Sequence, residues 1–499
     1  MTTIDTHATG TAGLSGDGGT VTVAPDTVST DGFVAWITST DHKRVGRLFL
    51  GSSAVGALGV AVLGVLLGLD RTVSDRSILG SDVVPQLFAA FRIGLVFAVV
   101  VPALLGLAIA VVPLQVGARS VAFPRLAATG FWLWLVGLVL VTITISANGG
   151  PGGGNRRMVE GFLVAHVVLL LGLFAGAVPV ATTVLTTRAP GMNMRRVPPY
   201  SFASLIGALV LVVGLPVLAG ALILHFVDYR YGGSAFGSSK VMWDHIGFGY
   251  TQPLTFGFAV AAFGIAIDGL ATSTGRRLPM RGTAFLGFGL VAIGTLGGIT
   301  QFSADLRRNL LDLSFGTALS DIVPFALFQL LPILGALIVF AVGGLALSKG
   351  KPQASPGAVL GMLGSLLILA AMLANALYHV GDARLGGTVF EEGTRLFLGY
   401  GVVLAVLGGV AHWAPKLWGR TLPAKTIIPL GLLGFVATAV AALPYLIAGF
   451  AKQPADAVVF AYSGPKGLWN ALSMIGHALD AADRARLHRR RRRHVHRRG

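Results

Sequence analysis

Long apolar runs recur along the whole chain, and they constrain the fold more than any other feature of the sequence. About 20 apolar residues suffice to cross the roughly 30 Å hydrocarbon core of a bilayer as a helix. Eleven such runs lie at 48–69, 93–114, 131–148, 162–186, 203–226, 253–272, 284–302, 322–347, 357–379, 396–414 and 427–450. A twelfth begins at Leu468 and breaks off at Asp480. The sequence therefore predicts an all-α, polytopic transmembrane helical bundle with about 11–12 spans, occupying residues 32–479.

The low charge content excludes a soluble fold. Only 12% of the 499 residues are charged, 54% are hydrophobic, and the mean hydropathy is +0.76. Soluble domains carry roughly 25% charged residues. The 69 glycines suit membrane helices that pack closely. Cysteine is absent, which excludes disulfides and thiolate metal sites.

The basic residues carry a net charge of +17 and gather in alternate loops, which sets the expected orientation. They include Lys43, Arg44 and Arg47, then Arg119 and Arg125, Arg188, Arg195 and Arg196, Arg276, Arg277 and Arg281, Lys349 and Lys351, and Lys416, Arg420 and Lys425. Because cytoplasmic loops collect Lys and Arg, we predict a cell-membrane protein with a cytoplasmic N-terminus, and no nucleic-acid partner.

Two terminal segments differ from the rest of the chain. Residues 1–31 are rich in Gly, Thr and Ser, which predicts a disordered cytoplasmic tail. Residues 480–499 form a basic cytoplasmic tail. This tail has two interpretations: a segment attracted to anionic lipid, or a decayed end that cuts off an apolar span.

Five motifs, in order between about residues 38 and 476, carry a resemblance to a known family. They are STDHKRVGRLFL, VVPLQVGARSVAFPRLAATGFWLW, APGMNMRRVPPYSFASLI, VMWDHIGFGYTQPLTFGFAVAAFGI and HWAPKLWGR. The chain resembles subunit I of the haem-copper terminal oxidases, the cytochrome c oxidase family. The resemblance implies that family's helical bundle. A fold does not by itself determine function, so the site residues need a separate argument.

Subunit I of that family reduces dioxygen to water with two haems and a copper ion, so the resemblance implies histidine ligands inside the bundle. The positions aligned with those ligands hold other residues: Phe91, Gln252, Ser303, Ala304, Gly393 and Arg395. Haem iron takes His, Cys, Met or Tyr as its axial donor, and an arginine stays cationic. We therefore predict that neither haem nor copper is bound as a cofactor, with no catalytic or metal-binding residues.

Further positions that the resemblance links to catalysis also differ. Phe256 stands where the family has a tyrosine, and Leu254 stands where it has a proton-delivering glutamate. Ser120 and Ala127 occupy proton-entry positions in the connection between the second and third helices. These substitutions agree with loss of the redox centres.

A few ionisable residues lie in or beside the predicted spans. They are Arg92, Asp268, Glu391, Glu392 and Arg395. Ionisable groups inside a membrane are costly and are usually paired or functional. One hypothesis is that Glu391 or Glu392 pairs with Arg92 or Arg395 and fills part of the vacated cavity. The alternative is that both glutamates lie in an outer loop and face water.

Three functions remain open on the sequence alone. The leading one is a pseudoenzyme: a homologue of cytochrome c oxidase subunit I that acts as an accessory part of aerobic respiration. Its expected partners are the lipid bilayer and other respiratory-complex subunits. The second is a working oxidase subunit, with electron transport from cytochrome c to O2 and proton translocation. The third is a transporter that uses the vacated core, with Arg92 and Asp268 as sites.

Overall fold

The computed structural model describes residues 38–73, 77–232, 242–249, 254–299, 322–455 and 464–496, together with Trp36. The chain divides into two units, Met1–Ser39 and Thr40–Gly499. The predicted disordered tail, 1–31, lies outside the described residues. The second unit holds the long helices.

Helices make up almost all of this unit, and the described residues hold no β-strand beyond one isolated bridge between Thr388 and Pro454. The longer helices are α2 (His42–Asp70), α3 (Val83–Ile93), α4 (Val101–Val116), α5 (Pro124–Ser146), α6 (Arg156–Thr186), α7 (Pro199–Tyr231), α9 (Leu254–Thr274), α10 (Arg281–Ile293), α14 (Leu331–Lys349), α15 (Pro356–Tyr378), α16 (Phe390–Trp418), α17 (Ala424–Phe450) and α18 (Lys466–His496). The short ones are α8 (Met242–Ile246) and α13 (Val323–Phe325).

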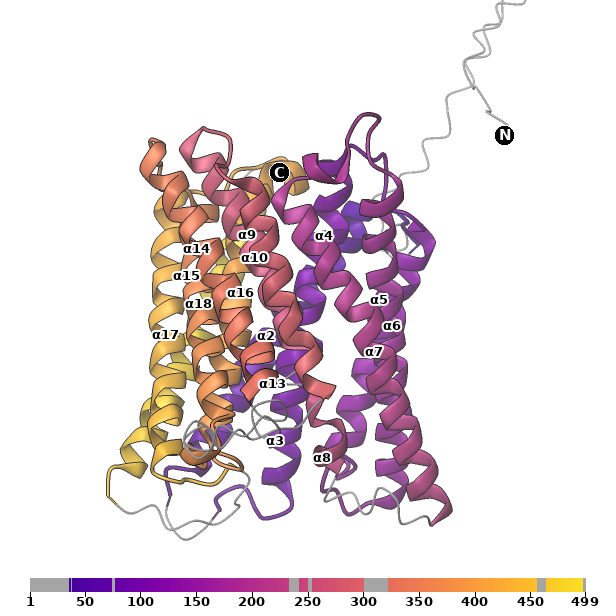
Figure 1. Cartoon of the computed structure of the whole chain (residues 1–499). Helices are drawn as coiled ribbons and strands as arrows, with labels where there is room; N and C mark the ends of the chain where they lie inside the picture. Colours follow the sequence, from indigo (N-terminus) through magenta and orange to yellow (C-terminus); the bar gives the residue numbers. More distant parts are fainter. Residues whose placement is uncertain are drawn as a thin grey trace, which may run out of the picture. The chain divides into compact units, whose positions relative to one another are not determined.

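Ten helical segments in the described part of the chain are long and apolar enough to cross a membrane. Each of the eleven predicted spans overlaps a helix, since α10 and the 3-10 turn Gly294–Ile299 account for the seventh. Consecutive spans run antiparallel, with α3 and α4 together forming one of them, so every second connection between spans lies at the same end of the bundle (Figure 1). The predicted fold, a polytopic helical membrane bundle, is confirmed.

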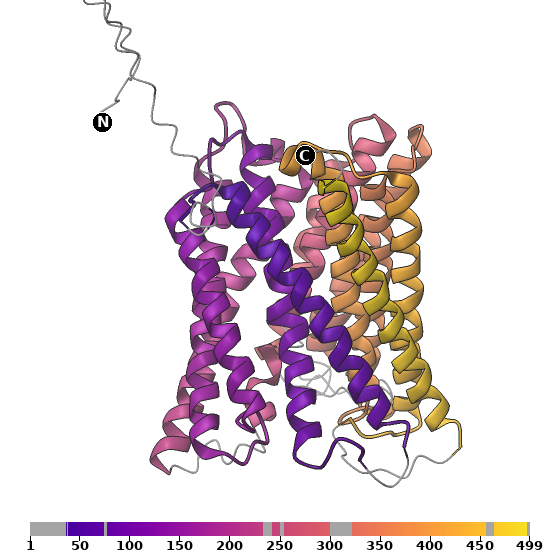
Figure 2. The same cartoon turned by 180° about the vertical axis from the view of Figure 1, so that it is seen from behind.

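The last helix extends beyond the twelfth apolar run. That run breaks off at Asp480, but α18 continues without interruption from Lys466 to His496. It lies beside α2 and α17, and Figure 2 shows it running along α2. Its polar residues Asn470, Ser473 and His477 are buried, which places this face of α18 inside the bundle.

The segment Val83–Val116 is the most buried of the candidate spans. It is built from α3, a π-helical turn (Gly94–Val100) and α4. Pro102 follows the π-helical turn. Because proline has no N–H, it interrupts the α-helical pattern of backbone hydrogen bonds, and the extra residue in the π-helical turn accommodates this interruption. The side chain of Trp134 in α5 donates a hydrogen bond to the Phe97 carbonyl of this turn, with a length of 2.8 Å.

Glycine allows α5 and α6 to pack closely. A Cβ at Gly172 would lie 2.2 Å from the backbone nitrogen of Trp134, and one at Gly137 would lie 2.4 Å from that of Leu169. Side-chain caps set two helix starts: Asn155 accepts from the Met158 N–H at the start of α6, and Ser355 accepts from the Ala358 N–H at the start of α15. These contacts help to position α5, α6 and α15 around the buried segment Val83–Val116.

Candidate functional site

Two arginines and two glutamates meet where α3 faces the first turn of α16. The Arg92 Nε donates to Glu392 Oε1 at 2.8 Å, and the Arg92 Nη2 donates to the same oxygen. The Arg395 Nη1 also donates to Glu392 Oε1, at 2.7 Å, while the Arg395 Nη2 donates to Glu391 Oε1. We call these four residues the quartet. Pairing of these glutamates with Arg92 or Arg395 was one of two alternatives that the sequence left open, and the structure shows it.

The quartet is shielded from solvent. The side chains of Arg92 and Arg395 are each 10% exposed, that of Glu392 is 2% exposed, and that of Glu391 is 21% exposed. Two cations and two carboxylates sum to zero charge, which is the arrangement that makes burial of such groups tolerable. The Arg92 guanidinium also lies 4.0 Å from the centre of the Phe88 ring, a cation–π contact.

The local sequence explains how the quartet forms. Glu391, Glu392 and Arg395 are three and four residues apart on one helix, so their side chains lie on one face of α16. The two glutamates occupy the first turn, where the helix dipole favours negative charge. Arg92 belongs to the last turn of α3. Its ion pairs therefore connect two helices that are 300 residues apart in sequence.

A second polar cluster lies at the opposite end of the bundle, where α4, α7 and α9 meet. Gln115 donates from its Nε2 to Asp268 Oδ2 at 2.7 Å, and the Ser201 hydroxyl donates to the Gln115 Oε1 at 2.6 Å. We call these three residues the Asp268 network. Asp268, a predicted intramembrane site, is 9% exposed. Among the described residues, no basic side chain lies within 4 Å of its carboxylate; its side-chain hydrogen-bond partner is neutral, and Arg281 interacts with it electrostatically at longer range.

The buried polar face of α18 was missed by the sequence analysis. Asn470 donates to the Arg71 carbonyl at 2.9 Å, and Ser473 donates to the Ala441 carbonyl at 2.8 Å. The His477 Nδ1 lies 3.1 Å from the Tyr400 hydroxyl oxygen. The signal was available: the polar residues recur every three or four positions, which places them on one helix face.

Five positions that the resemblance links to metal binding or catalysis fall wholly or partly outside the described residues. Gln252, Ser303 and Ala304 lie outside the described residues, as do the side chains of Leu254 and Phe256.

The structure does place Ser120 and Ala127. Ser120 is half-buried in the turn between α4 and α5, and Ala127 is buried in α5. Both stand at the end of the bundle opposite the quartet. Within the described ranges, no three His, Asp or Glu side chains are grouped so as to hold a metal ion.

Comparison with known proteins identifies the family. Residues 44–300, just over half of the chain, match the family described as "Cytochrome C and Quinol oxidase polypeptide I". This chain belongs to that subunit I family.

Curated subunit I relatives support the assignment along more of the chain. The "Cytochrome c oxidase subunit 1" of Bacillus sp. (strain PS3) is 25% identical over 417 residues, covering 78% of this chain and 65% of the relative. The "Probable quinol oxidase subunit 1" of Staphylococcus haemolyticus (strain JCSC1435) is 26% identical over 478 residues, covering 89% of this chain and 69% of the relative. The chain thus matches about two thirds of the length of these subunit I proteins.

Three of the positions that the subunit I resemblance aligns with metal ligands lie in the described part of the chain. Phe91 is buried, and its ring packs edge-on against the His477 ring with the centres 5.7 Å apart. Arg395 belongs to the quartet. Any Cβ at Gly393 would lie 2.8 Å from the Leu446 Cδ2.

These three side chains do not fit the iron of a haem. Phenylalanine and glycine offer no donor atom, and the guanidinium of Arg395 is a cation already bound by two carboxylates. The backbone also leaves no space for a larger residue at position 393, because a Cβ there would lie 2.9 Å from the Ala442 carbonyl oxygen.

Proposed function

We propose that this subunit I homologue is an accessory, non-catalytic component of a respiratory membrane complex and holds no haem between α3 and α16. The observation that carries the proposal is the quartet. Arg92 stands next to Phe91, and Arg395 stands on a position that the resemblance aligns with a haem ligand; both arginines are paired with Glu391 and Glu392.

The physical argument concerns charge as well as donor atoms. Inserting a porphyrin between α3 and α16 would separate Arg92 from Glu392, which are joined by two hydrogen bonds. Breaking a buried ion pair leaves uncompensated charge and costs about 3–5 kcal/mol. No iron–ligand bond would offset this cost at Phe91 or Gly393, because neither side chain has a donor atom.

The location and partners follow from the family. The relatives are named as oxidase subunits, which supports other subunits of such a complex as partners, together with the lipid bilayer. The N-terminus is proposed to be cytoplasmic, because the basic loops lie at the end of the bundle where α2 begins.

Haem analysis of the intact protein tests the proposal. The full chain would be produced in an aerobic host supplied with a haem precursor, purified in mild detergent, and assayed for haem by the pyridine haemochrome method and for copper by mass spectrometry. The Bacillus subunit I relative, prepared in the same way, is the control for haem supply. We expect far less than one haem per chain and no reduced-minus-oxidised difference band. Haem in whole-number ratio would overturn the proposal.

A working oxidase subunit is the second candidate, because the match to the relatives named as oxidase subunits covers most of the chain. It predicts oxygen consumption by membranes that contain this chain, driven by reduced cytochrome c or quinol and sensitive to cyanide. If the chain has the accessory role, membranes from a host whose own oxidases are deleted should consume oxygen at the same rate with and without the chain.

A further inference from the structure

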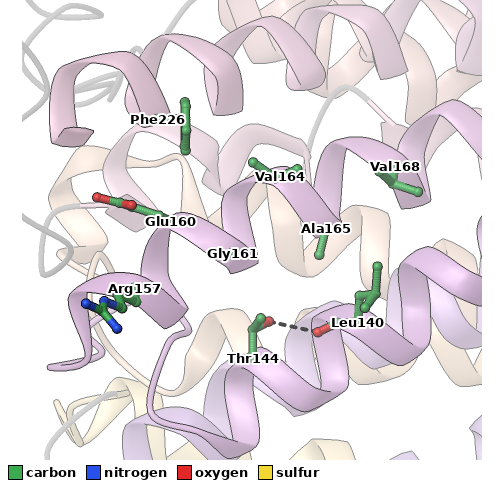
Figure 3. Close-up of a pocket in the computed structure, with 9 residues that line it drawn as sticks. All are labelled: Leu140, Thr144, Arg157, Glu160, Gly161, Val164, Ala165, Val168 and Phe226. Atoms are coloured by element: carbon green, nitrogen blue, oxygen red, sulfur yellow. Dashed lines mark hydrogen bonds between the residues drawn. The ribbon is translucent and has the colours of Figure 1, made fainter. Parts of the chain in front are cut away.

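An open groove runs along the outside of the bundle between α5, α6 and α7. Its volume is about 410 Å³, within the rough range of 300–1,000 Å³ that small-molecule sites occupy. Its walls are mainly apolar and include Leu140, Val164, Val168 and Phe226 (Figure 3). Gly161 also lines the groove, and the missing side chain at that position leaves space between α5 and α6.

One end of the groove carries charge. Arg157 and Glu160 lie there, near the start of α6 (Figure 3). Glu160 is paired with two other arginines: its Oε2 accepts from Arg230 at 2.9 Å, and its Oε1 lies 3.5 Å from the Arg156 Nε. In contrast, Arg157 is exposed and makes no ion pair with any described acidic residue. The mouth of the groove therefore presents one cation that is free to bind an anion.

The groove has the depth of one lipid leaflet. Eleven residues separate Arg157 from Val168, and at 1.5 Å per residue these span roughly 16 Å along α6. Half of the roughly 30 Å hydrocarbon core is about the same distance. The apolar walls therefore begin near the headgroup region and end near the middle of the membrane, and the exposed side chains of Leu140 and Val164 face lipid.

We propose that this groove binds one anionic phospholipid, with an acyl chain along α6 and the phosphate paired with Arg157. Arg157 would pair with the lipid phosphate, and the apolar groove, which is as deep as one leaflet, would hold the acyl chain. A free phosphate ion would use only Arg157, and a helix of a partner protein would use only the apolar walls.

Lipid titration followed by native mass spectrometry tests this proposal on the full chain, purified and delipidated in mild detergent. The probes are phosphatidylglycerol, phosphatidylcholine and inorganic phosphate. We expect the first phosphatidylglycerol to bind about fivefold more tightly than the first phosphatidylcholine, the size expected for one basic residue near the membrane surface. Millimolar inorganic phosphate should not displace the lipid.

Two variants probe the two halves of the site separately. Arg157→Gln should remove the preference for phosphatidylglycerol, leaving both lipids equally weak. Val164→Trp should fill the groove and abolish the first binding event for both lipids. The matched controls are Arg125→Gln, an exposed arginine on α5 at the other end of the bundle, and Val136→Trp, a valine on α5 that is 51% exposed against 50% for Val164. Both controls should bind lipid as the unmodified chain does.

Lipid binding that is unchanged in Arg157→Gln and in Val164→Trp would overturn the proposal. So would displacement of the lipid by inorganic phosphate. A third contrary result is release of a co-purified polypeptide by Val164→Trp with lipid binding intact, since the occupant would then be a protein helix. All substituted positions are exposed, so thermal unfolding of each variant should match that of the unmodified chain.

Discussion

The quartet and the Asp268 network both bury a carboxylate inside a spanning helix, yet they compensate for it in different ways. At the quartet, Glu392 Oε1 accepts hydrogen bonds from two guanidinium groups. In the Asp268 network, the carboxylate accepts from the neutral amide of Gln115, which in turn accepts from Ser201. The two clusters lie at opposite ends of the bundle and connect different helices.

This difference shows which cluster depends on charge. Removing Glu392 would leave two buried cations facing one partly exposed glutamate. Removing the charge of Asp268 would leave neutral hydrogen-bond partners, and only its longer-range interaction with Arg281 would be lost. Uncompensated buried charge is far more costly than a weakened neutral hydrogen bond. We therefore expect the quartet to hold α3 against α16 by ion pairs, and the Asp268 network to hold α4, α7 and α9 by hydrogen bonds alone.

The largest expected effect comes from Glu392→Gln. It should lower the free energy of unfolding by about 3–5 kcal/mol, because Arg92 and Arg395 lose their shared counter-ion in a buried site. Unfolding in mixed detergent–SDS micelles, followed by circular dichroism, measures the change. Glu160→Gln is the matched control, since Glu160 pairs with two arginines whose side chains are 65% and 55% exposed. That pair should contribute less than about 1 kcal/mol, and equal losses in the two variants would contradict the charge argument.

The next test adds Arg92→Met to Glu392→Gln. The double variant leaves Arg395 paired with Glu391, so no buried cation stays unpaired. It should unfold at a higher SDS fraction than Glu392→Gln alone, with a coupling energy of up to about 3 kcal/mol in the double-mutant cycle. Additive losses would show that the quartet acts through packing rather than through charge.

Close helix packing beside each cluster gives a third comparison. Gly393 follows Glu392, and Gly269 follows Asp268. A Cβ at Gly269 would meet backbone atoms, 2.8 Å from the Gly357 carbonyl, whereas one at Gly393 would meet the movable Leu446 side chain at 2.8 Å and a single backbone atom, the Ala442 carbonyl oxygen, at 2.9 Å. Gly269→Ala should therefore cost more stability than Gly393→Ala, with both within about 1–3 kcal/mol. Gly344→Ala, where a Cβ meets nothing within 4 Å, should not destabilise; a reversed order would contradict the packing argument.

The sequence predicted the bundle and offered the pairing in the quartet as one of two alternatives, because both follow from the cost of placing polar groups in lipid. Apolar length identifies the spans, and charges that cannot reach water need partners. That reasoning does not extend to the polar face of α18. Asp480, where the twelfth apolar run breaks off, and His477 are both buried, and hydropathy alone does not show that this face packs inside the bundle.

The groove at Val164 was also beyond sequence reasoning. It exists because Gly161 and the neighbouring helices leave space there, and such a space depends on how three helices meet. Hydropathy and motif spacing describe one helix at a time, so they contain no information about gaps between helices.

The smallest expected effect is that of Asp268→Asn. The asparagine keeps an oxygen that can accept the hydrogen bond from Gln115 Nε2, and Arg281 loses only an electrostatic interaction beyond ion-pair distance, so the free energy of unfolding should change by about 1 kcal/mol or less. Asp268→Leu removes the acceptor altogether and leaves the half-buried Gln115 amide without it, which should lower the free energy of unfolding by about 1–3 kcal/mol. The same micelle unfolding assay measures both. Should Asp268→Asn prove as damaging as Glu392→Gln, Asp268 would be balancing charge, and the contrast between the two ends of the bundle would fail.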